Sequence, residues 1–319
     1  MIEIPDSNQI AHKYGYLPYM IERYLDFLGL DGTLALLNAN EQPLIPSIRA
    51  NTLKIEPAKV KSRLKQKGFE LKSIKYIPSG FKVTKSPLNL GSLHEYLQGY
   101  YYLQNVASMI PPVILNPSRE DIVVDMCAAP GSKSTHLAQI MKNEGKLILI
   151  EKNTKRIPAL DMNLRRMGVT NSIILNEDAI ELSRLKIQAD KILLDAPCTG
   201  EGLIIEDPSR KRSKSLKDIN KIAIIQRKLL KAGLDALNPG GQLLYSTCSI
   251  APEENELIIN QVLQDITNCS IINIPFQYGV PGLTRVYGEE LMVDLKHSQR
   301  IYPHLHETIG FFLCLIKKK

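Results

Sequence analysis

Cysteine is scarce in this sequence, and its five residues form neither a CxxC pair nor a spacing with histidine that is typical of zinc sites. An odd count without such pairs argues against a disulfide-built scaffold and fits a compartment that keeps thiols reduced. Long apolar runs are also missing: none approaches the roughly 20 residues that span a bilayer, and residues 1–6 lack the basic start of a signal peptide. We therefore expect a cytoplasmic protein with no membrane segment and no bound metal.

Two common nucleotide-binding signatures are absent as well. The sequence has no GxGxxG fingerprint and no GxxxxGKS/T loop, which disfavours a nicotinamide-dependent oxidoreductase and a P-loop enzyme. What the sequence does contain is an ordinary 44% of hydrophobic residues over 319 positions. This is enough for a sizeable core and for two domains, or for one large domain with an appendage.

Acidic residues are outnumbered by basic ones, which gives a net charge of +7, and the imbalance is concentrated. Residues 54–85 contain ten lysines and arginines against two glutamates, a local net charge of +8. A second basic run, RKRSK, occupies residues 210–214. A single run of this kind is equally consistent with a solvated surface, but two concentrated patches favour a polyphosphate partner.

The order of the predicted elements indicates an α/β fold. A helical stripe covers residues 17–28, and a small α/β unit spans about 40–90, with strands at 47–53, 69–76 and 81–85 around a basic helix at 57–67. From residue 121 onward, apolar strands alternate with amphipathic helices, which predicts a parallel sheet covered on both faces. The predicted strands are 121–126, 146–151, 172–175, 191–195, 242–246 and 310–316, and the main helices are 132–143, 153–168, 218–237 and 252–263.

Ligand-binding features follow the first three of these strands. The loop DMCAAPGSK at residues 125–133 joins a strand to a helix, and Gly131 would let backbone N–H groups approach a carboxylate or phosphate. Glu151 closes the second strand, where a carboxylate can accept hydrogen bonds from ribose hydroxyls, and Asp178 follows the third, near the expected adenine. Adenosine with a carboxylate and no polyphosphate cradle suits S-adenosylmethionine. Alternatively, both acids only cap the following helices.

Two further strand ends carry thiols, Cys198 in DAPC and Cys248 in YSTC. Cytosine C5 is a poor nucleophile, but addition of a thiolate at C6 breaks the aromaticity of the ring and lets C5 accept a methyl group. Asp195 is placed to assist at N3 of the base, and a second thiol could help to expel the first. Cys269 and Cys314 lie in apolar runs and are expected to be buried, whereas Cys127 is expected to pack within its loop.

These segments resemble the RsmB/Sun-type RNA (cytosine-5) methyltransferases, in particular compact archaeal-like members that modify tRNA. The resemblance extends from about residue 45 to the C-terminus. It rests on several motifs in order: RANTLK at 49–54, GYYYLQ at 99–104, DMCAAPGSK at 125–133, DAPCTG at 195–200, YSTCS at 245–249, PEENE at 252–256 and GFF at 310–312.

The resemblance implies a Rossmann-like class I methyltransferase sheet of seven strands with an antiparallel last strand, S-adenosylmethionine as the methyl donor and RNA as the partner. It also implies an RNA-binding region at 1–112 before a methyltransferase domain at 113–319, and we expect a monomer. Cys248 would attack C6, Cys198 would aid product release, and Asp195 and Lys133 would contact the base. The cofactor would be held by Cys127, Ala128, Ala129, Pro130, Gly131, Ser132, Lys133, Glu151, Arg156, Asp178 and Asp195.

Several alternatives stay open at this point. A DNA cytosine-5 methyltransferase would use Cys198 as its nucleophile, but that chemistry needs only one thiol and leaves Cys248 without a role. A non-catalytic RNA-binding or assembly factor would use only the basic patches. Within the RNA enzymes we favour tRNA as the substrate over rRNA.

Overall fold

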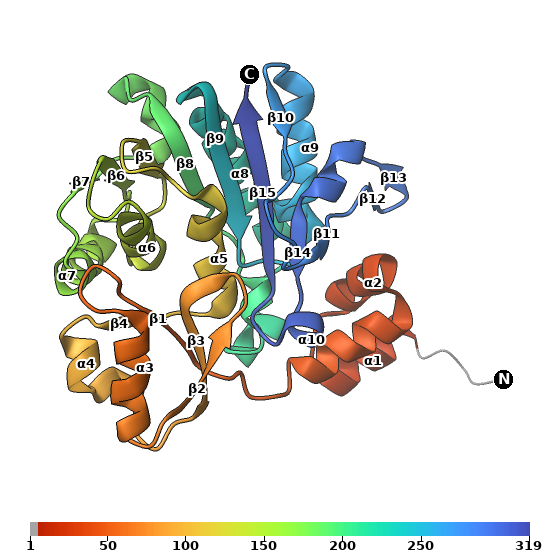
Figure 1. The fold of residues 1–319 in the computed structure, drawn as a ribbon. Coiled ribbons are helices and arrows are strands. Elements are labelled where there is room, and N and C mark those ends of the chain that lie inside the picture. Colours follow the sequence, from red (N-terminus) through yellow and green to blue (C-terminus); the bar gives the residue numbers. More distant parts are fainter. Residues whose placement is uncertain (1–5) are drawn as a thin grey trace.

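The structure, a computed structural model, describes residues 6–319. Figure 1 shows three parts: a pair of N-terminal helices, a small unit built on a four-stranded sheet, and a large sheet with helices on both faces. The helix pair comprises α1 (Ser7–Tyr14) and α2 (Pro18–Ala39), so the helix predicted at 17–28 is present and continues further. Gly29 interrupts α2 with a positive φ of 66°, a conformation that favours glycine.

The large sheet has nine strands, eight of them in the order β11-β14-β15-β9-β8-β5-β6-β7, with β10 paired to β15. The strands from β7 to β9 pair in parallel, and β15 runs antiparallel to β9. The expected α/β class and antiparallel last strand are confirmed, while the short β10 and β11 raise the count above seven. The bounds are β5 (Ile122–Asp125), β6 (Lys146–Ile150), β7 (Ser172–Leu175), β8 (Ala189–Asp195), β9 (Leu237–Thr247), β10 (Cys269–Ile271), β11 (Val280–Pro281), β14 (Gln299–Ile301) and β15 (Phe311–Lys318).

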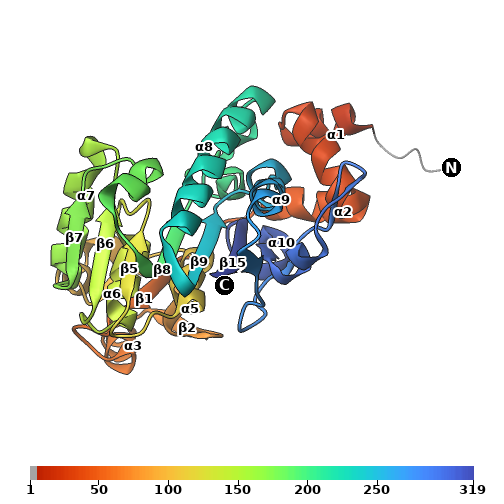
Figure 2. The same ribbon diagram turned by 90° about the horizontal axis from the view of Figure 1, so that it is seen from above.

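Apolar residues on both faces of the central strands bury the sheet between two helical layers (Figure 2). Along β8, Leu193 packs with one layer, whereas Ile192 and Leu194 pack with the other, as the alternation of side chains along a strand requires. The first layer contains α5 (Val106–Leu115), α6 (Ser132–Ile140) and α7 (Ile157–Met167), and the second contains α8 (Leu216–Asp235) and α9 (Glu256–Asp265).

The small unit is larger than the sequence indicated. Its sheet has the order β2-β3-β1-β4, so a fourth strand, β4 (Tyr101–Leu103), extends the unit beyond residue 90. Tyr101 and Tyr102 are buried, so these two rings pack in the protein and are not free to stack on bases. The other elements are β1 (Ser47–Ala50), α3 (Pro57–Gln66), β2 (Glu70–Ile74), β3 (Ile77–Lys85) and α4 (His94–Leu97).

Helix α5 crosses the domain boundary that we expected between residues 112 and 113. The helix contains both Pro111 and Pro112, and most of its side chains are buried against the large sheet. Proline usually interrupts a helix, but this segment is almost entirely apolar. Its burial stabilises the helix by more than the missing backbone hydrogen bonds cost. The link between the two sheets is therefore part of the core.

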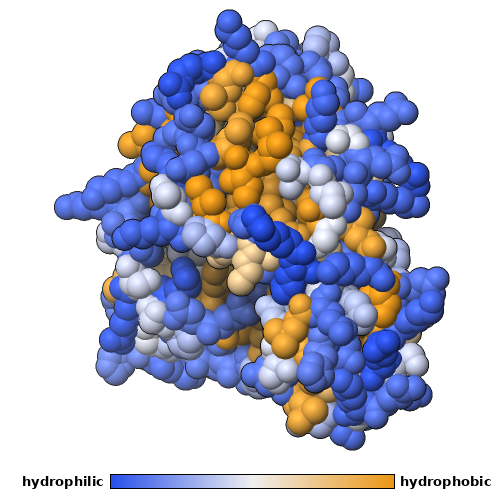
Figure 3. All heavy atoms as spheres, turned by 90° about the vertical axis from the view of Figure 1, so that its left-hand side faces the viewer, coloured by the Kyte–Doolittle hydropathy of each residue, from blue (hydrophilic) through white to orange (hydrophobic). Residues whose placement is uncertain are grey.

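One edge of the large sheet stays partly uncovered. The connection between β7 and β8 is the short η3 (Ala179–Leu185), and Ile173 on β7 is 57% exposed. Figure 3 shows the side of the molecule on which β7 lies: hydrophilic side chains cover most of it, and apolar ones form one large patch in its upper half and smaller ones below.

The remaining elements are short. No helix within residues 6–319 is long and apolar enough to cross a membrane, and the same residues contain no group of three or more His, Cys, Asp or Glu that could hold a metal ion. The short elements are η1 (Leu90–Ser92), η2 (Thr154–Arg156), η4 (Glu201–Leu203), η5 (Pro208–Lys211), η6 (Pro252–Glu254), β12 (Arg285–Val286), β13 (Glu289–Glu290), η7 (Val293–His297) and α10 (Pro303–His306).

Candidate active site

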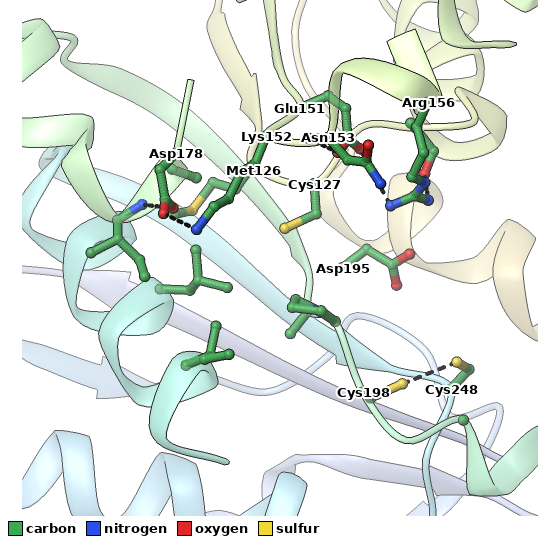
Figure 4. A pocket seen from close by; sticks show the side chains of 18 of the residues that line it. Met126, Cys127, Glu151, Lys152, Asn153, Arg156, Asp178, Asp195, Cys198 and Cys248 are labelled. Atoms are coloured by element: carbon green, nitrogen blue, oxygen red, sulfur yellow. Dashed lines mark hydrogen bonds and ion pairs between the residues drawn. The ribbon is translucent and has the colours of Figure 1, made fainter. Parts of the chain in front are cut away.

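A cavity of about 770 Å³ lies at the carboxyl ends of the parallel strands, where ligands bind in open α/β sheets. Five neighbouring strands, β5 to β9, contribute to its wall through residues at their carboxyl ends or within the next few positions. The sequence-predicted residues that line it are Cys127, Ala129, Glu151, Arg156, Asp178, Asp195, Cys198 and Cys248 (Figure 4).

The two thiols lie in contact. Cys248 directly follows β9 and Cys198 follows the adjacent β8, which brings their Sγ atoms to 3.1 Å, with one thiol donating to the other. Both cysteines are half-buried, and neither is in a disulfide. The hydrogen bond with Cys248, and then burial, raise the pKa of Cys198 well above that of a free thiol. Cys198 therefore keeps its proton at neutral pH and can serve as a proton donor.

Asp195 and Lys133 form an ion pair beside the thiols. Lys133 Nζ donates to Asp195 Oδ2 at 2.6 Å, and Ser246 Oγ donates to Asp195 Oδ1 at 3.0 Å. The Lys133 side chain is 9% exposed and that of Asp195 is 30% exposed, so the carboxylate faces the cavity while the lysine supports it from behind. Figure 4 shows Asp195 between Cys127 and the thiol pair. A carboxylate with this placement can accept a hydrogen bond from a base next to the thiols, and can donate one when it takes a proton from Lys133.

Glu151 and Asp178 lie at the end of the cavity away from the thiols (Figure 4). Buried Glu151 accepts from the backbone N–H of Asn153 through Oε1 at 2.7 Å, while its Oε2 accepts no hydrogen bond from residues 6–319. Asp178 caps η3 through the N–H of Ile180 and pairs with Lys152 Nζ at 2.6 Å. Partial burial opposes ionisation of Asp178, but the bonds from Lys152 and Ile180 outweigh it and lower its pKa.

Arg156 and Cys127 complete the wall at this end. Arg156 donates to the carbonyl of Ala129 and lies 3.4 Å from Glu151 Oε2, with its side chain 51% exposed. Burial raises the pKa of Cys127 well above its ordinary value, with the neighbouring Asp125 adding to the shift, which disfavours the thiolate form of this residue. The unsatisfied oxygen of Glu151 and the exposed guanidinium of Arg156 fit a ligand with ribose hydroxyls and a carboxylate, as S-adenosylmethionine has.

Family models match nearly the whole chain. Residues 112–317 match the family of 16S rRNA methyltransferases RsmB/F, and residues 17–106 match the N-terminal domain of 16S rRNA methyltransferase RsmF. The chain belongs to the RsmB/F methyltransferase family. The first match covers the large sheet with the cavity, and the second covers α2 and the small unit. These are the two parts of the chain in which the motifs of the sequence analysis lie.

The names of the relatives specify different RNA substrates. A mouse 28S rRNA (cytosine-C(5))-methyltransferase is 36% identical over 317 residues, which are 98% of this chain but only 40% of the mouse protein. The chain thus spans about two fifths of the length of this relative. A tRNA (cytosine(49)-C(5))-methyltransferase from Pyrococcus abyssi is 35% identical over 280 residues, 87% of this chain and 89% of that protein.

Solved structures of the family superpose closely. A methyltransferase homolog protein from Pyrococcus horikoshii has a TM-score of 0.90 and 38% identity, with 99% of both chains covered. NSun6 from the same organism, solved with the S-adenosylmethionine analogue SFG, has a TM-score of 0.83 and 27% identity, covering 93% of this chain and 97% of that one.

Part of the predicted cofactor loop shapes the site without lining the cavity. Ala128, Pro130, Gly131, Ser132 and Lys133 are not part of the cavity wall. Gly131 has a positive φ of 98°, and a Cβ on it would lie 3.0 Å from Leu160, so glycine makes the turn into α6. These residues place the start of α6 and the base of Lys133, while Ala129 and Cys127 face the cavity.

Other residues that line the cavity were not predicted as site residues. Some, such as Lys152 beside Glu151, neighbour a strand-end acid or thiol, Arg210 belongs to the basic run, and Ile225 and Leu229 on α8 carry no local signal. This set comprises Met126, Lys152, Asn153, Ala179, Ile180, Ala196, Pro197, Gly200, Leu203, Arg210, Ile225 and Leu229.

The basic run at 210–214 is largely committed to contacts within the protein. Arg210 donates to the carbonyl of Thr199 at 3.0 Å, Lys211 pairs with Glu41, and Arg212 donates to the carbonyl of Gly15 at 2.9 Å. This run therefore fastens the N-terminal helices to the thiol loop, and Arg210 alone of these three lines the cavity. Its interpretation as a free polyphosphate patch does not hold for these three side chains.

Proposed function

We propose that this protein methylates C5 of cytosine in RNA, with S-adenosylmethionine as the methyl donor and a covalent bond between Cys248 and C6 of the base. The observation that carries the proposal is the contact of the Cys198 and Cys248 Sγ atoms at 3.1 Å on the wall of a cavity that also presents Asp195. Two thiols in contact at one site fit a reaction in which one attacks and the other assists release.

Cys248 adds to C6 as a thiolate, which forms the S–C6 bond and moves the electron pair of the C5–C6 double bond to C5. Lys133 can pass a proton through Asp195 to N3 as negative charge develops on the ring and take it back when the S–C6 bond breaks, and Ser246 holds the carboxylate in place. After methylation, the electron pair of the C5–H bond re-forms the C5=C6 double bond as the S–C6 bond breaks, and the C5 proton passes to the Cys198 sulfur in exchange for the proton that this thiol gives up. Cys198, which keeps its proton, donates to the departing sulfur of Cys248.

The donor-binding residues occupy the other end of the cavity. Glu151 would accept from the ribose hydroxyls, Asp178 lies at the adenine end, and Arg156 is available for the carboxylate of the amino-acid part. S-adenosylmethionine, when bound, supplies an electrophilic methyl group on its sulfonium. Cys127 lies on the wall between these groups and Asp195 (Figure 4), and Ala129 also lines the cavity.

Replacing each thiol separately tests the mechanism. We expect Cys248→Ala to abolish the protein–RNA adduct that survives denaturing electrophoresis, because it removes the attacking sulfur. Cys198→Ala should accumulate this adduct, because addition proceeds while release stalls. Cys269→Ala, in β10 and outside the cavity, is the matched control and should behave as the wild-type protein. The opposite pattern, with adduct lost only in Cys198→Ala, would support the DNA-type assignment of the nucleophile.

For the RNA substrate we favour tRNA. The Pyrococcus abyssi tRNA enzyme aligns over 89% of its own length, whereas the mouse rRNA enzyme has 60% of its length outside the shared part. Ribosomal RNA is the second candidate, because the mouse protein is equally similar within that part. Bisulfite sequencing of RNA from cells with and without the gene distinguishes the two, because it identifies each cytosine whose methylation is lost.

A non-catalytic RNA-binding factor would not use the cofactor cavity. Because a ligand that binds only the native state stabilises it, S-adenosylmethionine at about 100 times its Kd should stabilise the protein by about 2.7 kcal/mol. A melting curve that does not move with added S-adenosylmethionine would favour the non-catalytic factor. A control with Asp178→Ala, which removes a group on the cavity wall, should show a reduced shift.

A further inference from the structure

We infer that Glu254 is a positioning residue that holds the two thiol loops in register through one buried carboxylate, an assignment that rests on the proposed function. Glu254 ends η6 and is 0% exposed. It is not on the wall of the cavity, so it acts only through the loops that it contacts.

The carboxylate binds the residue that follows each thiol. Oε1 of Glu254 accepts from the backbone N–H of Thr199 at 2.7 Å, and Oε2 accepts from Thr199 Oγ1 at 2.7 Å. Oε2 also accepts from Ser249 Oγ. Thr199 directly follows Cys198, and Ser249 directly follows Cys248. One side chain therefore fixes both loops at a distance of one residue from each sulfur.

Further contacts tie the same loops together. Gln226, from α8, donates through Nε2 to the carbonyl of Pro197 at 2.8 Å and lies 3.4 Å from Glu254 Oε1. The N–H of Gly202 donates to the carbonyl of Cys248 at 2.9 Å, which links the first loop directly to the second. Glu254 is the point at which three segments meet, so its loss leaves the Gly202–Cys248 hydrogen bond as the remaining backbone link between the loops and loosens their register.

The neighbouring glutamates make other contacts. Glu253 lies 3.4 Å from the buried Arg23, and Glu256 forms a buried ion pair with Arg300. Of the three glutamates in residues 252–256, Glu254 alone contacts a thiol loop. Burial raises the pKa of Glu254, while the bonds from Ser249 and Thr199 oppose the rise. A carboxyl group at this depth is costly unless its oxygens are satisfied, which these donors achieve.

The two steps of the reaction allow a selective test. Total RNA from cells that lack the gene is the probe, and denaturing gels follow formation and decay of the protein–RNA adduct. Glu254→Ala should slow both steps, by about 100-fold if the loops shift by roughly 1 Å. Glu254→Gln should recover most of the rate, because its amide can accept from the Thr199 N–H and donate to the two hydroxyls.

Single-donor variants separate the two loops. Ser249→Ala frees only the Cys248 loop and should slow adduct formation by about tenfold, whereas Thr199→Val frees the Cys198 loop and should slow decay by a similar factor. These variants also keep the test decisive if Glu254→Ala does not fold. Glu256→Gln is the matched control: it breaks a buried ion pair in the same segment and lowers the melting temperature, but both rates should stay within about threefold of wild type.

The outcomes are distinguishable. Unchanged rates in Glu254→Ala, or an equal loss in Glu256→Gln, would overturn the positioning role while a normal wild-type adduct keeps the proposed function. If Glu254→Ala also lost the rise in melting temperature with S-adenosylmethionine, the positioning role would be overturned, because the substitution would then disturb donor binding as well as the two thiol loops. No adduct and no methylation with the wild-type protein would overturn the proposed function, and the positioning role with it.

Discussion

Two aspartates at adjacent strand ends illustrate how the surroundings set the role of a residue. Asp125 ends β5 and Asp195 ends β8, and the two strands pair in parallel. Asp195 faces the cavity and is paired with Lys133, which suits a group that acts on a ligand. Asp125 is 1% exposed, and burial raises its pKa to about 6, so it has a structural role. It accepts from Ser134 Oγ and from the N–H of Cys127 and so shapes the loop.

The buried carboxyl of Asp125 should make stability depend on pH. Because its pKa is about 6 in the folded state against 3.8 for the free side chain, the folded state binds the proton more tightly. Its contribution to the free energy of unfolding is therefore complete below pH 3.8 and is lost as the pH rises through 6. Asp125→Asn, which can keep both hydrogen bonds, should gain about 3 kcal/mol relative to wild type between pH 4 and pH 8.

Urea denaturation of both proteins across this pH range measures the effect. A difference between Asp125→Asn and wild type that does not change with pH would contradict the prediction. Glu120→Gln, at an exposed position shortly before β5, serves as the control.

At the scale of elements, the motif at 49–54 shows what a sequence pattern leaves undetermined. Its polar residues belong to a region that we expected to bind RNA, but three of them join the small unit to the large domain. Arg49 donates to the carbonyl of Ser132 at 2.8 Å, Asn51 to that of Met167 at 2.7 Å, and Lys54 to that of Arg166 at 2.8 Å. Helical and strand periodicity identify the elements, but they do not show which polar side chains face a neighbouring domain.

The contacts of Arg49 lead to a stability prediction. Its guanidinium is 0% exposed and also donates to Gln104 Oε1 at 3.0 Å and to Thr135 Oγ1 at 2.8 Å. Lysine cannot reach these separate acceptors with one ammonium group, so Arg49→Lys should lower the free energy of unfolding by about 2 kcal/mol. Guanidinium denaturation followed by circular dichroism measures this value.

The exposed Lys59 on α3 gives the control for Arg49. Its side chain is 69% exposed, and Lys59→Ala should change the free energy of unfolding by less than about 0.5 kcal/mol. Equal stability of Arg49→Lys and wild type would show that the junction between the two domains does not depend on the guanidinium.

For the whole molecule, the sequence was sufficient where the fold itself brings residues together. Strand ends converge in a parallel sheet, so Glu151, Asp178, Asp195, Cys198 and Cys248 could be assigned to one site before the structure was known. Tertiary contacts were not accessible in this way. The burial of α5 with its two prolines, the fourth strand of the small unit and the internal use of the run at 210–214 all depend on neighbours far away in the sequence.

The charge of the small unit, after its internal pairs are removed, gives the last prediction. Lys67 and Arg63 pair with Glu95, and Lys54 is used at the domain junction, whereas Lys61 and Lys65 are exposed on α3. Within residues 6–319 neither of these two forms an ion pair, and both border one shallow cavity beside β2.

If Lys61 and Lys65 neutralise two phosphates of RNA, replacing both by glutamine should weaken binding by about tenfold near 0.1 M salt and reduce the slope of log K against log salt by about 2. Filter binding with total tRNA over a series of salt concentrations measures both quantities. Lys142 and Lys146, exposed at the opposite end of the strands, provide the matched pair, and their replacement should alter neither. An equal loss in both pairs would mean that RNA senses only the net charge of the protein, because a specific contact surface depends on where its cations lie.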